Sequence, residues 1–283
     1  MKRFLIYTII VIGVFLFLSR CVLCKMRWSD AKAQRVFKSK HVPLSIYDTV
    51  IDNRHIHYAV AGDQRLPALI FIHGSPGSWF HYYRFMCDAD LLKKYRIISI
   101  DRPGFGHSDY GDAMHLQDQC KLLLSVLTRL KNNKPMILCG HSLGGPVVAK
   151  LAADAPGLIN KLVIIAGSLD PALEEKETWR QVVNKKPMYW FMPGVFQTSN
   201  TELLYLKDDL KPLANDLGRI TCPVLFIHGD KDNWVPIENI AYGQKMMIHA
   251  ESIHADTLKG ADHNFPWKRR EEFKNILMHL DKE

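Results

Sequence analysis

The chain lacks the cysteine pattern of a disulfide-stabilised or zinc-binding protein. It has six cysteines in 283 residues, and no spacing among them matches a disulfide framework. Cys21 and Cys24 have C-x-x-C spacing, but no second pair of ligands accompanies them, so we expect no metal site there. The other four fall in predicted helices and strands: Cys87, Cys120, Cys139 and Cys222. We expect these four to be buried free thiols.

Internal repeats and low-complexity tracts are also missing. Charged residues make up 23% of the chain and hydrophobic residues 47%, values typical of globular proteins, so bulk disorder is excluded. A chain of this length can form one large α/β domain or two small ones.

The longest apolar run is too short to cross a bilayer by itself. Residues Phe4–Leu18 are apolar at all but one position, yet at about 1.5 Å per residue they fall short of the hydrocarbon core. The run is long enough if the helix continues to Cys24 with Arg20 reaching the interface. The competing interpretation is a cleaved signal peptide and a secreted protein, but no A-x-A-like site follows. We therefore expect residues 1–24 to be an uncleaved membrane anchor, with residues 4–24 in the bilayer.

Residues 25–43 form a basic, amphipathic connector between this segment and the remainder of the chain. The formal net charge is +8, and much of the basic excess lies near the N-terminus: Lys2, Arg3, Arg20, Lys25, Arg27, Lys32, Arg35, Lys38 and Lys40. A basic tract beside an apolar segment is typical of contact with anionic lipid, and we expect no nucleic acid as a partner. Basic residues on both sides of the apolar run leave the side of the membrane open.

Apolar runs alternate with helical patterns over residues 44–283. Two β-like segments, Leu44–Ile51 and His55–Val60, predict a hairpin. Apolar runs predict further strands at Ala68–Ile72, Tyr95–Ile100, Met136–Cys139, Leu162–Ala166, Val224–Ile227 and Ser252–Leu258. Helical patterns occupy about Ser78–Cys87, Ala113–Lys131, Leu143–Ala153, Glu238–Met247 and Trp267–Leu280. This alternation predicts an α/β fold whose mostly parallel sheet has helices on both faces.

The alternation breaks at about residues 170–209, where no strand is evident. Several aromatic residues there are candidates for an apolar wall of a substrate site: Trp179, Tyr189, Trp190, Phe191 and Phe196. Insertions at the carboxyl ends of strands lie where ligands bind, so we expect a short lid. The alternative is a peripheral helical excursion packed on its own aromatics. We expect the acidic residues of this segment to form a solvated face: Glu174, Glu175 and Glu177.

The segment Gly140-His141-Ser142-Leu143-Gly144 fits G-x-S-x-G between a predicted strand and a predicted helix, the context in which this motif marks a nucleophile. The sharp turn holds Ser142 in strained backbone geometry, and the two glycines leave room for it. The helix N-terminus offers unpaired N–H groups to a developing anion.

A serine hydroxyl needs a general base, and the base needs a carboxylate to orient it. Both types of residue follow Ser142 in the chain. Asp230 and Asp232 lie in the loop after a predicted strand, and Asp232 is the better candidate because it lies further into the loop. His263 lies in the loop before the final helix.

These motifs together resemble the α/β-hydrolase superfamily over about residues 44–283. His73-Gly-Ser-Pro-Gly77 resembles the HGxPG loop of that family, and Asp101-Arg-Pro-Gly-Phe-Gly-His-Ser108 resembles its DxxGxGxS turn. The nucleophile elbow, the acid loop His228–Asp232 and the base loop Asp262-His263 follow in the family order.

The resemblance implies roles for individual residues. Ser142 is expected to be the nucleophile, Asp232 the orienting acid and His263 the general base, with the backbone N–H groups of Ser75 and Leu143 as the oxyanion hole. His73, His107, His141 and His228 are expected to be structural, and Asp101 and Arg102 are expected to hold their own turn.

The same motifs discriminate among relatives. Epoxide hydrolases and haloalkane dehalogenases carry an aspartate at the elbow, where this chain has Ser142, so an alkyl-enzyme ester is disfavoured. The expected function is hydrolysis of a carboxylic ester with an apolar acyl group, without cofactor or metal. Amidase, thioesterase, C–C bond hydrolase and perhydrolase chemistry stay open, as does a non-catalytic binding role.

Overall fold

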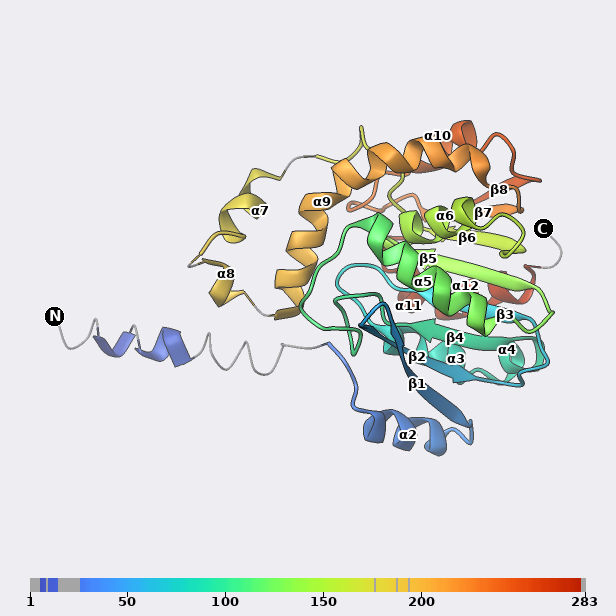
Figure 1. Ribbon diagram of the computed structural model, residues 1–283, viewed down its shortest axis with the longest axis horizontal. Coiled ribbons are helices and arrows are strands. Elements are labelled where there is room, and N and C mark those ends of the chain that lie inside the picture. Colours follow the sequence, from blue (N-terminus) through green and yellow to red (C-terminus); the bar gives the residue numbers. More distant parts are fainter. Residues whose placement is uncertain are drawn as a thin grey trace.

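A central sheet of eight strands organises the fold, in the order β1-β2-β4-β3-β5-β6-β7-β8 (Figure 1). The computed structural model describes residues 6–8, 10–14, 26–175, 177–186, 188–192 and 194–280. The strands are β1 Leu44–Ile51, β2 Arg54–Ala61, β3 Ala68–Ile72, β4 Arg96–Ile100, β5 Met136–His141, β6 Lys161–Ile165, β7 Val224–Gly229 and β8 Ile253–Leu258. β1 and β2 are antiparallel, β2 and β4 are antiparallel, and all other pairs are parallel. The predicted hairpin and the predicted parallel sheet are confirmed.

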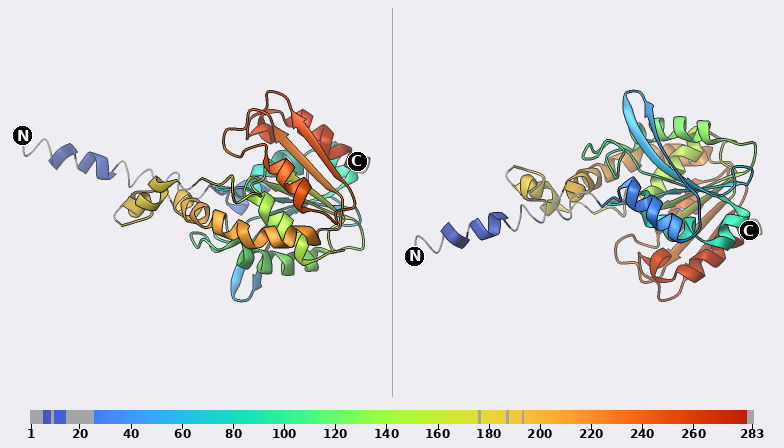
Figure 2. Two further views of the ribbon diagram at one scale, coloured as in Figure 1. Left: turned by 90° about the horizontal axis from the view of Figure 1, so that it is seen from above. Right: turned by 90° about the horizontal axis from the view of Figure 1, so that it is seen from below.

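The alternation of side chains along each strand divides the core into two layers. In β3, Ile70 and Ile72 belong to one hydrophobic cluster, while Leu69 and Phe71 belong to the other. The first cluster is covered by α5 Leu116–Leu130, α6 Gly144–Asp154, α9 Gly194–Asp216, η2 Leu217–Arg219 and α10 Asn239–Met246. The second is covered by α2 Asp30–Ser39, η1 Trp79–Tyr82, α3 Tyr83–Met86, α4 Ala89–Lys94, α11 Phe265–Lys268 and α12 Arg270–Met278 (Figure 2). Burial on both faces explains why the central strands are apolar at nearly every position.

The helix boundaries differ from the sequence predictions in three places. The pattern at 78–87 forms only η1 and α3, and α4 follows it as a separate helix that begins after the Asp88 cap. The final helix is divided at Arg269 into α11 and α12. In the lid, α9 continues to Asp216 because its C-terminal half packs on the core through Leu210 and Leu213.

The basic connector packs on the α/β domain. Ser29 accepts a hydrogen bond from the Lys32 backbone N–H at 3.3 Å and caps α2. Phe37, on the buried face of α2, is fully enclosed. Before the helix, the Trp28 ring stacks on Phe80 with centroids 5.2 Å apart. Residues 26–39 are therefore part of the folded body.

The predicted anchor falls mostly outside the described residues. Residues 6–8 and 10–14 are helical, and the rest of the 1–24 segment is not described. Across the described ranges, no helix has the length and apolar character needed to cross a bilayer. The anchor prediction therefore has no support in the structure.

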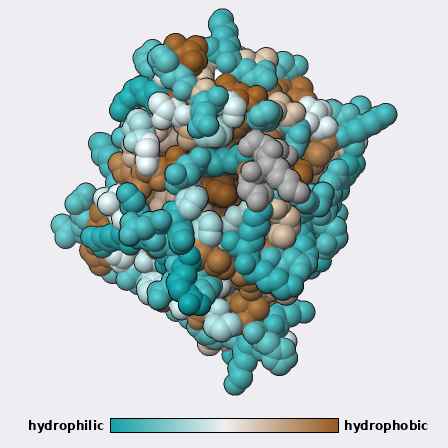
Figure 3. All heavy atoms as spheres, turned by 90° about the vertical axis from the view of Figure 1, so that its right-hand side faces the viewer, coloured by the Kyte–Doolittle hydropathy of each residue, from teal (hydrophilic) through white to brown (hydrophobic). Residues whose placement is uncertain are grey.

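The face of the molecule turned away from α7 Thr178–Val183 and α8 Met188–Phe191 is mainly hydrophilic, with small dispersed apolar areas (Figure 3). The four cysteines beyond residue 26 are free, as expected. Cys120 and Cys139 are buried, whereas Cys87 and Cys222 are only half-buried because they lie at element ends.

Candidate active site

Ser142 lies at the turn between β5 and α6 with a backbone φ of 55°, a left-handed conformation that non-glycine residues rarely adopt. Its backbone N–H donates to the Ile165 carbonyl at 2.9 Å, which ties the turn to the neighbouring strand. A Cβ on Gly140 would lie 2.2 Å from the Gly144 carbonyl oxygen, so only glycine fits there. The strained turn predicted from G-x-S-x-G is present in the structure.

Asp232 and His263 meet at the carboxyl ends of β7 and β8. The His263 Nδ1 donates to Asp232 Oδ2 at 2.7 Å. The other carboxylate oxygen accepts the backbone N–H groups of Trp234 and Val235 at 2.8 and 2.9 Å. Burial raises the pKa of Asp232, but the hydrogen bonds from His228, His263 and Val235 outweigh it and hold the pKa below its ordinary value. An ionised Asp232 fixes the orientation of the His263 imidazole through Nδ1.

The neighbouring carboxylate, Asp230, contacts the loop before His263 instead of the imidazole. Its Oδ1 accepts the Gly260 backbone N–H at 2.5 Å, so it fastens the turn that precedes His263. The preference for Asp232 over Asp230 agrees with this geometry, because only Asp232 contacts the imidazole.

Ser142 lines two cavities, which meet at this residue. The first, of about 600 Å³, also contains His263 and is walled by aromatic side chains: Phe80, Tyr83, Phe85, Phe196, Trp234 and Trp267. The second, of about 880 Å³, lies under the lid and contains acidic side chains: Glu174, Glu175, Glu177 and Asp230. A substrate bound across Ser142 would therefore have one part in apolar and one part in acidic surroundings.

The expected oxyanion donors flank Ser142. A Cβ on Gly74 would lie 2.9 Å from Ser142 Cβ, so the loop that carries Ser75 passes directly beside the serine. Leu143 immediately precedes α6. To the extent that the chain is described, the backbone N–H groups of Ser75 and Leu143 donate no hydrogen bond to protein atoms. Both amides are thus available to a negatively charged oxygen.

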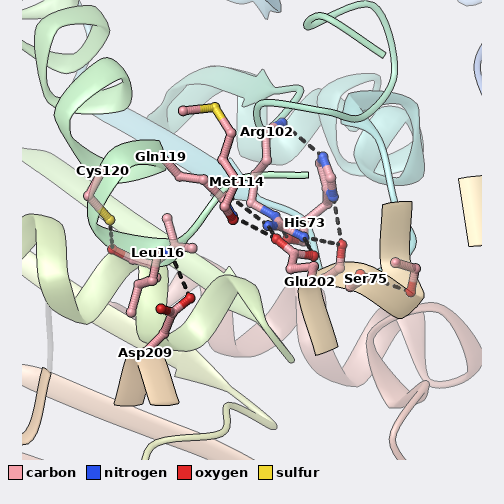
Figure 4. A network of polar contacts seen from close by, with 12 residues as sticks. His73, Ser75, Arg102, Met114, Leu116, Gln119, Cys120, Glu202 and Asp209 are labelled. Atoms are coloured by element: carbon pink, nitrogen blue, oxygen red, sulfur yellow. Dashed lines mark hydrogen bonds and ion pairs between the residues drawn. The ribbon is translucent and has the colours of Figure 1, made fainter. Parts of the chain in front are cut away.

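A buried polar network supports the Ser75 loop (Figure 4). The Arg102 guanidinium donates to the carbonyls of His73 and Gly74 at 2.8 and 3.0 Å. It forms a bidentate ion pair with Glu202 of α9, with one contact at 3.0 Å. Gln119 of α5 accepts from Arg102 at 2.8 Å and donates to Glu202 at 2.7 Å. The network connects α9 to the backbone of the loop that carries Ser75.

This network corrects the expectation for Arg102. Its side chain holds the loop after β3 rather than its own turn, and it is fully buried. Sequence reasoning did not identify Glu202 or Gln119 as its partners. They are separated from Arg102 by 100 and 17 positions and belong to no motif, so no local signal could have found them.

Asp101 does hold its own turn, as expected. Its two carboxylate oxygens accept the backbone N–H groups of Trp79 at 2.7 Å and His107 at 2.9 Å. A Cβ on Gly106 would collide with the Asp101 carboxylate at 2.1 Å, which explains the glycine in the motif.

Asp101 predicts a pH dependence of stability. Burial raises the pKa of Asp101 to about 7 from an ordinary value of 3.8. Stability from this group is fully present below pH 3.8 and is lost as the pH rises through 7, because only the folded state retains the proton in that interval. Asp101→Asn cannot titrate. Between pH 4 and pH 8, we therefore expect the free energy of unfolding of the wild type to fall by roughly 4 kcal/mol relative to that of Asp101→Asn, as measured by urea denaturation. This corresponds to about three pKa units at 1.4 kcal/mol each. The exposed Asp118→Asn should show no such trend, and a constant difference for Asp101→Asn would contradict the assignment.

The positions of the lid aromatics agree only in part with the prediction of an apolar wall. Phe196 lines both cavities. Trp179 and Trp190 line neither, and each is 52% exposed because α7 and α8 project away from the sheet (Figure 1). Tyr189 is half-buried and also lines neither cavity. The side chain of Phe191 lies outside the described part. The prediction of a wall made by all these aromatics is therefore wrong for Trp179, Tyr189 and Trp190.

The acidic residues of the lid are also placed differently. Glu174, Glu175 and Glu177 line the second cavity and do not form only a solvated face. Glu174 is half-buried, and burial raises its pKa. A turn precedes them, in which the Leu173 backbone N–H donates to the Asp170 carbonyl at 3.1 Å.

The other histidines have structural contacts, as expected. His141 Nε2 lies 2.9 Å from the His263 carbonyl oxygen and holds the backbone of the base loop. His228 donates from Nε2 to the Val235 carbonyl at 3.0 Å. Burial lowers the pKa of His141 to about 3 and, together with the Arg102 charge, lowers the pKa of His73 well below its ordinary value. The rings of His141 and His73 therefore stay neutral near pH 7.

Comparisons with known proteins agree with the fold. Residues 67–199 match the family described as alpha/beta hydrolase fold. A putative esterase/lipase of Haemophilus influenzae is 26% identical over 228 residues, which cover 70% of this chain and 77% of that protein. Epoxide hydrolase 4 of Mus musculus is 30% identical over 115 residues, which cover 38% of this chain and 30% of that protein.

Two solved structures illustrate the structural likeness. A membrane phospholipase A, described as a bacterial virulence factor, has a TM-score of 0.67 at 20% identity. The match covers 100% of this chain and 99% of the phospholipase chain. The 2-hydroxy-6-oxo-6-phenylhexa-2,4-dienoate hydrolase of a Rhodococcus strain has a TM-score of 0.63 at 21% identity, covering 86% of this chain and 100% of its own. At these identities the likeness concerns the fold.

Proposed function

The chain belongs to the α/β-hydrolase superfamily, and we propose that it is a serine hydrolase that cleaves a carboxylic ester through an acyl-enzyme intermediate. The main observation behind the proposal is that Ser142 and His263 line one cavity and that Asp232 is hydrogen-bonded to His263. Ser142, in its left-handed turn, and His263 both line the 600 Å³ cavity, and His263 is hydrogen-bonded to Asp232 at 2.7 Å. This combination supplies a nucleophile, a base and an orienting carboxylate.

The proposed reaction has two halves, acylation of Ser142 and hydrolysis of the acyl-enzyme, and His263 acts as base and then as acid in each. Ser142 Oγ attacks the ester carbonyl carbon while His263 takes its proton, and the resulting oxyanion accepts hydrogen bonds from the Ser75 and Leu143 backbone N–H groups. His263 then gives the proton to the leaving alcohol. Water then attacks the acyl-enzyme while His263 takes its proton, and His263 gives that proton to Ser142 Oγ as the Oγ–acyl bond breaks and the acid is released.

Residue 142 also distinguishes this proposal from epoxide opening. Several relatives are named epoxide hydrolases. The elbow of this chain carries the serine hydroxyl of Ser142, which lacks the carboxylate needed to form an alkyl-enzyme ester. The relative named putative esterase/lipase agrees with acyl transfer.

The two cavities support an orientation of the substrate. We assign the acyl group to the aromatic cavity of about 600 Å³, because burial of apolar surface there is favourable. The leaving group then occupies the acidic cavity. We also propose that residues 1–24 hold the protein at a membrane, a proposal supported by their apolar sequence alone.

The assignment of the acyl group to the aromatic cavity predicts that alanine substitutions of two exposed lid aromatics, Phe196 and Trp190, have different effects on KM. Phe196 lines both cavities, whereas Trp190 lines neither. Turnover of p-nitrophenyl esters from acetate to palmitate is expected to peak at one chain length. Phe196→Ala should raise the KM for the preferred ester about three- to tenfold, as expected for about 1 kcal/mol of lost apolar contact, while Trp190→Ala leaves it unchanged.

The same experiment separates the alternatives. A fluorophosphonate probe that labels Ser142 in a protein inactive on every ester would redirect the proposal to amide, thioester or C–C substrates. Absence of both turnover and labelling in folded protein would reject catalysis and favour a binding role.

A further inference from the structure

Three side chains from separate parts of the chain meet where the segment around α2 packs against β2 and the loop after β4. Asp30, His57 and His107 each offer a ligand atom, and these atoms all lie within 4.8 Å of one another. We propose that they bind a divalent transition-metal ion, with Zn²⁺ as the best fit, and that this ion fixes α2 to the catalytic domain. The proposal does not depend on the catalytic function.

His57 has the surroundings of a metal ligand. It lies on β2 and is 1% exposed. Its Nδ1 lies 2.9 Å from Asp48 Oδ1, so a proton on Nδ1 is shared with a carboxylate and the lone pair is left on Nε2. That buried Nε2 has no hydrogen-bond partner within the described ranges. A carboxylate behind a histidine whose other nitrogen is free is the usual arrangement around metal-bound histidines.

His107 is held in a complementary way. Its Nε2 lies 2.8 Å from the Trp28 carbonyl oxygen, which can only accept, so the proton is on Nε2 and the lone pair is on Nδ1. Its backbone N–H is fastened to Asp101 at 2.9 Å. The rings of His57 and His107 lie 4.6 Å apart between centroids. Each imidazole therefore keeps one nitrogen whose lone pair is not taken up by these hydrogen bonds, and the two rings lie side by side.

Asp30 completes the set from the first turn of α2. Its side chain is exposed and can adjust its rotamer, whereas the two histidines are fixed by their hydrogen bonds. Tetrahedral Zn²⁺ with bonds of about 2.0–2.1 Å requires ligand atoms about 3.3 Å apart, so the ligand atoms, which lie within 4.8 Å of one another, must approach by at most about 1.5 Å. Water would supply the fourth ligand.

The charge and ligand type favour a transition metal over Mg²⁺ or Ca²⁺. Two neutral imidazoles with one carboxylate suit Zn²⁺, Co²⁺ and Ni²⁺, while hard cations prefer all-oxygen sites. The second carboxylate, Asp48, lies behind His57 and adds negative potential.

The test is a Co²⁺ titration of the EDTA-treated full-length protein without an affinity tag, followed by visible absorption. The expected result is one equivalent bound in tetrahedral geometry, together with a rise in Tm on addition of Zn²⁺. Asp30→Asn and His107→Gln should each weaken binding at least about tenfold and remove the Tm shift. The matched control is His55→Gln, an exposed histidine on β2 outside the cluster, which should bind as the wild type does.

Asp30→Asn is the decisive variant because its exposed side chain leaves the core intact. His263→Ala should retain the Co²⁺ spectrum, which separates this site from the catalytic histidine. The proposal is rejected if no Co²⁺ spectrum appears, if Asp30→Asn and His107→Gln bind as tightly as the wild type, or if His55→Gln loses as much affinity as they do.

Discussion

Replacement of Ser142 by alanine is expected to lower kcat on p-nitrophenyl esters by about 10⁴- to 10⁶-fold, because the proposed reaction has no other nucleophile. The residual rate would come from the oxyanion donors and substrate binding. The fold should persist, since alanine occupies less space than serine in the same turn. Steady-state kinetics on the preferred ester, with Tm measured alongside, provide the comparison.

Two further variants isolate the role of Ser142. Ser45→Ala changes an exposed serine on β1 and should be fully active. Ser142→Gly should be as inactive as Ser142→Ala but more stable by about 1 kcal/mol, because glycine adopts a φ of 55° without strain. Substantial ester turnover by Ser142→Ala would sink the proposed function.

Replacement of Glu202 by glutamine is expected to destabilise the protein by about 3–5 kcal/mol. The change leaves the fully buried Arg102 guanidinium without its carboxylate. It also loosens the support of the Gly74 carbonyl, to which Arg102 donates at 3.0 Å. Urea denaturation gives the free energy of unfolding, and kcat is expected to fall as the oxyanion loop loses its fixed position.

A double-variant cycle tests whether this cost comes from an unpaired charge. Arg102→Met with Glu202→Leu removes both charges, so the pair should cost less than the sum of the two single variants. On the exposed lid helix α7, Glu177→Gln breaks the ion pair with Arg180 and should cost under about 1 kcal/mol. A loss under 1 kcal/mol for Glu202→Gln as well would show that the buried network contributes little.

Much of the candidate site could be predicted because its parts are local in sequence. The elbow requires glycine at 140 and 144 and a serine between them, and these positions lie within a single turn. A serine nucleophile requires a general base and an orienting carboxylate. The candidates for these roles, His263 and Asp232, each follow a strand of the parallel part of the sheet. Parallel strands end at the same edge, so the order of motifs along the chain already implied their meeting.

The tertiary structure alone decided which residues support that site. Arg102 meets Glu202 and Gln119 across three separate elements, and Asp30 meets His57 and His107 in the same way. It also directed Phe196 into the cavities while Trp179 and Trp190 face outward. Local sequence patterns predict turns, strands and helix faces, because these features depend on residues that are near one another in the chain. Contacts between distant elements depend on how whole layers pack, and no single segment carries that information.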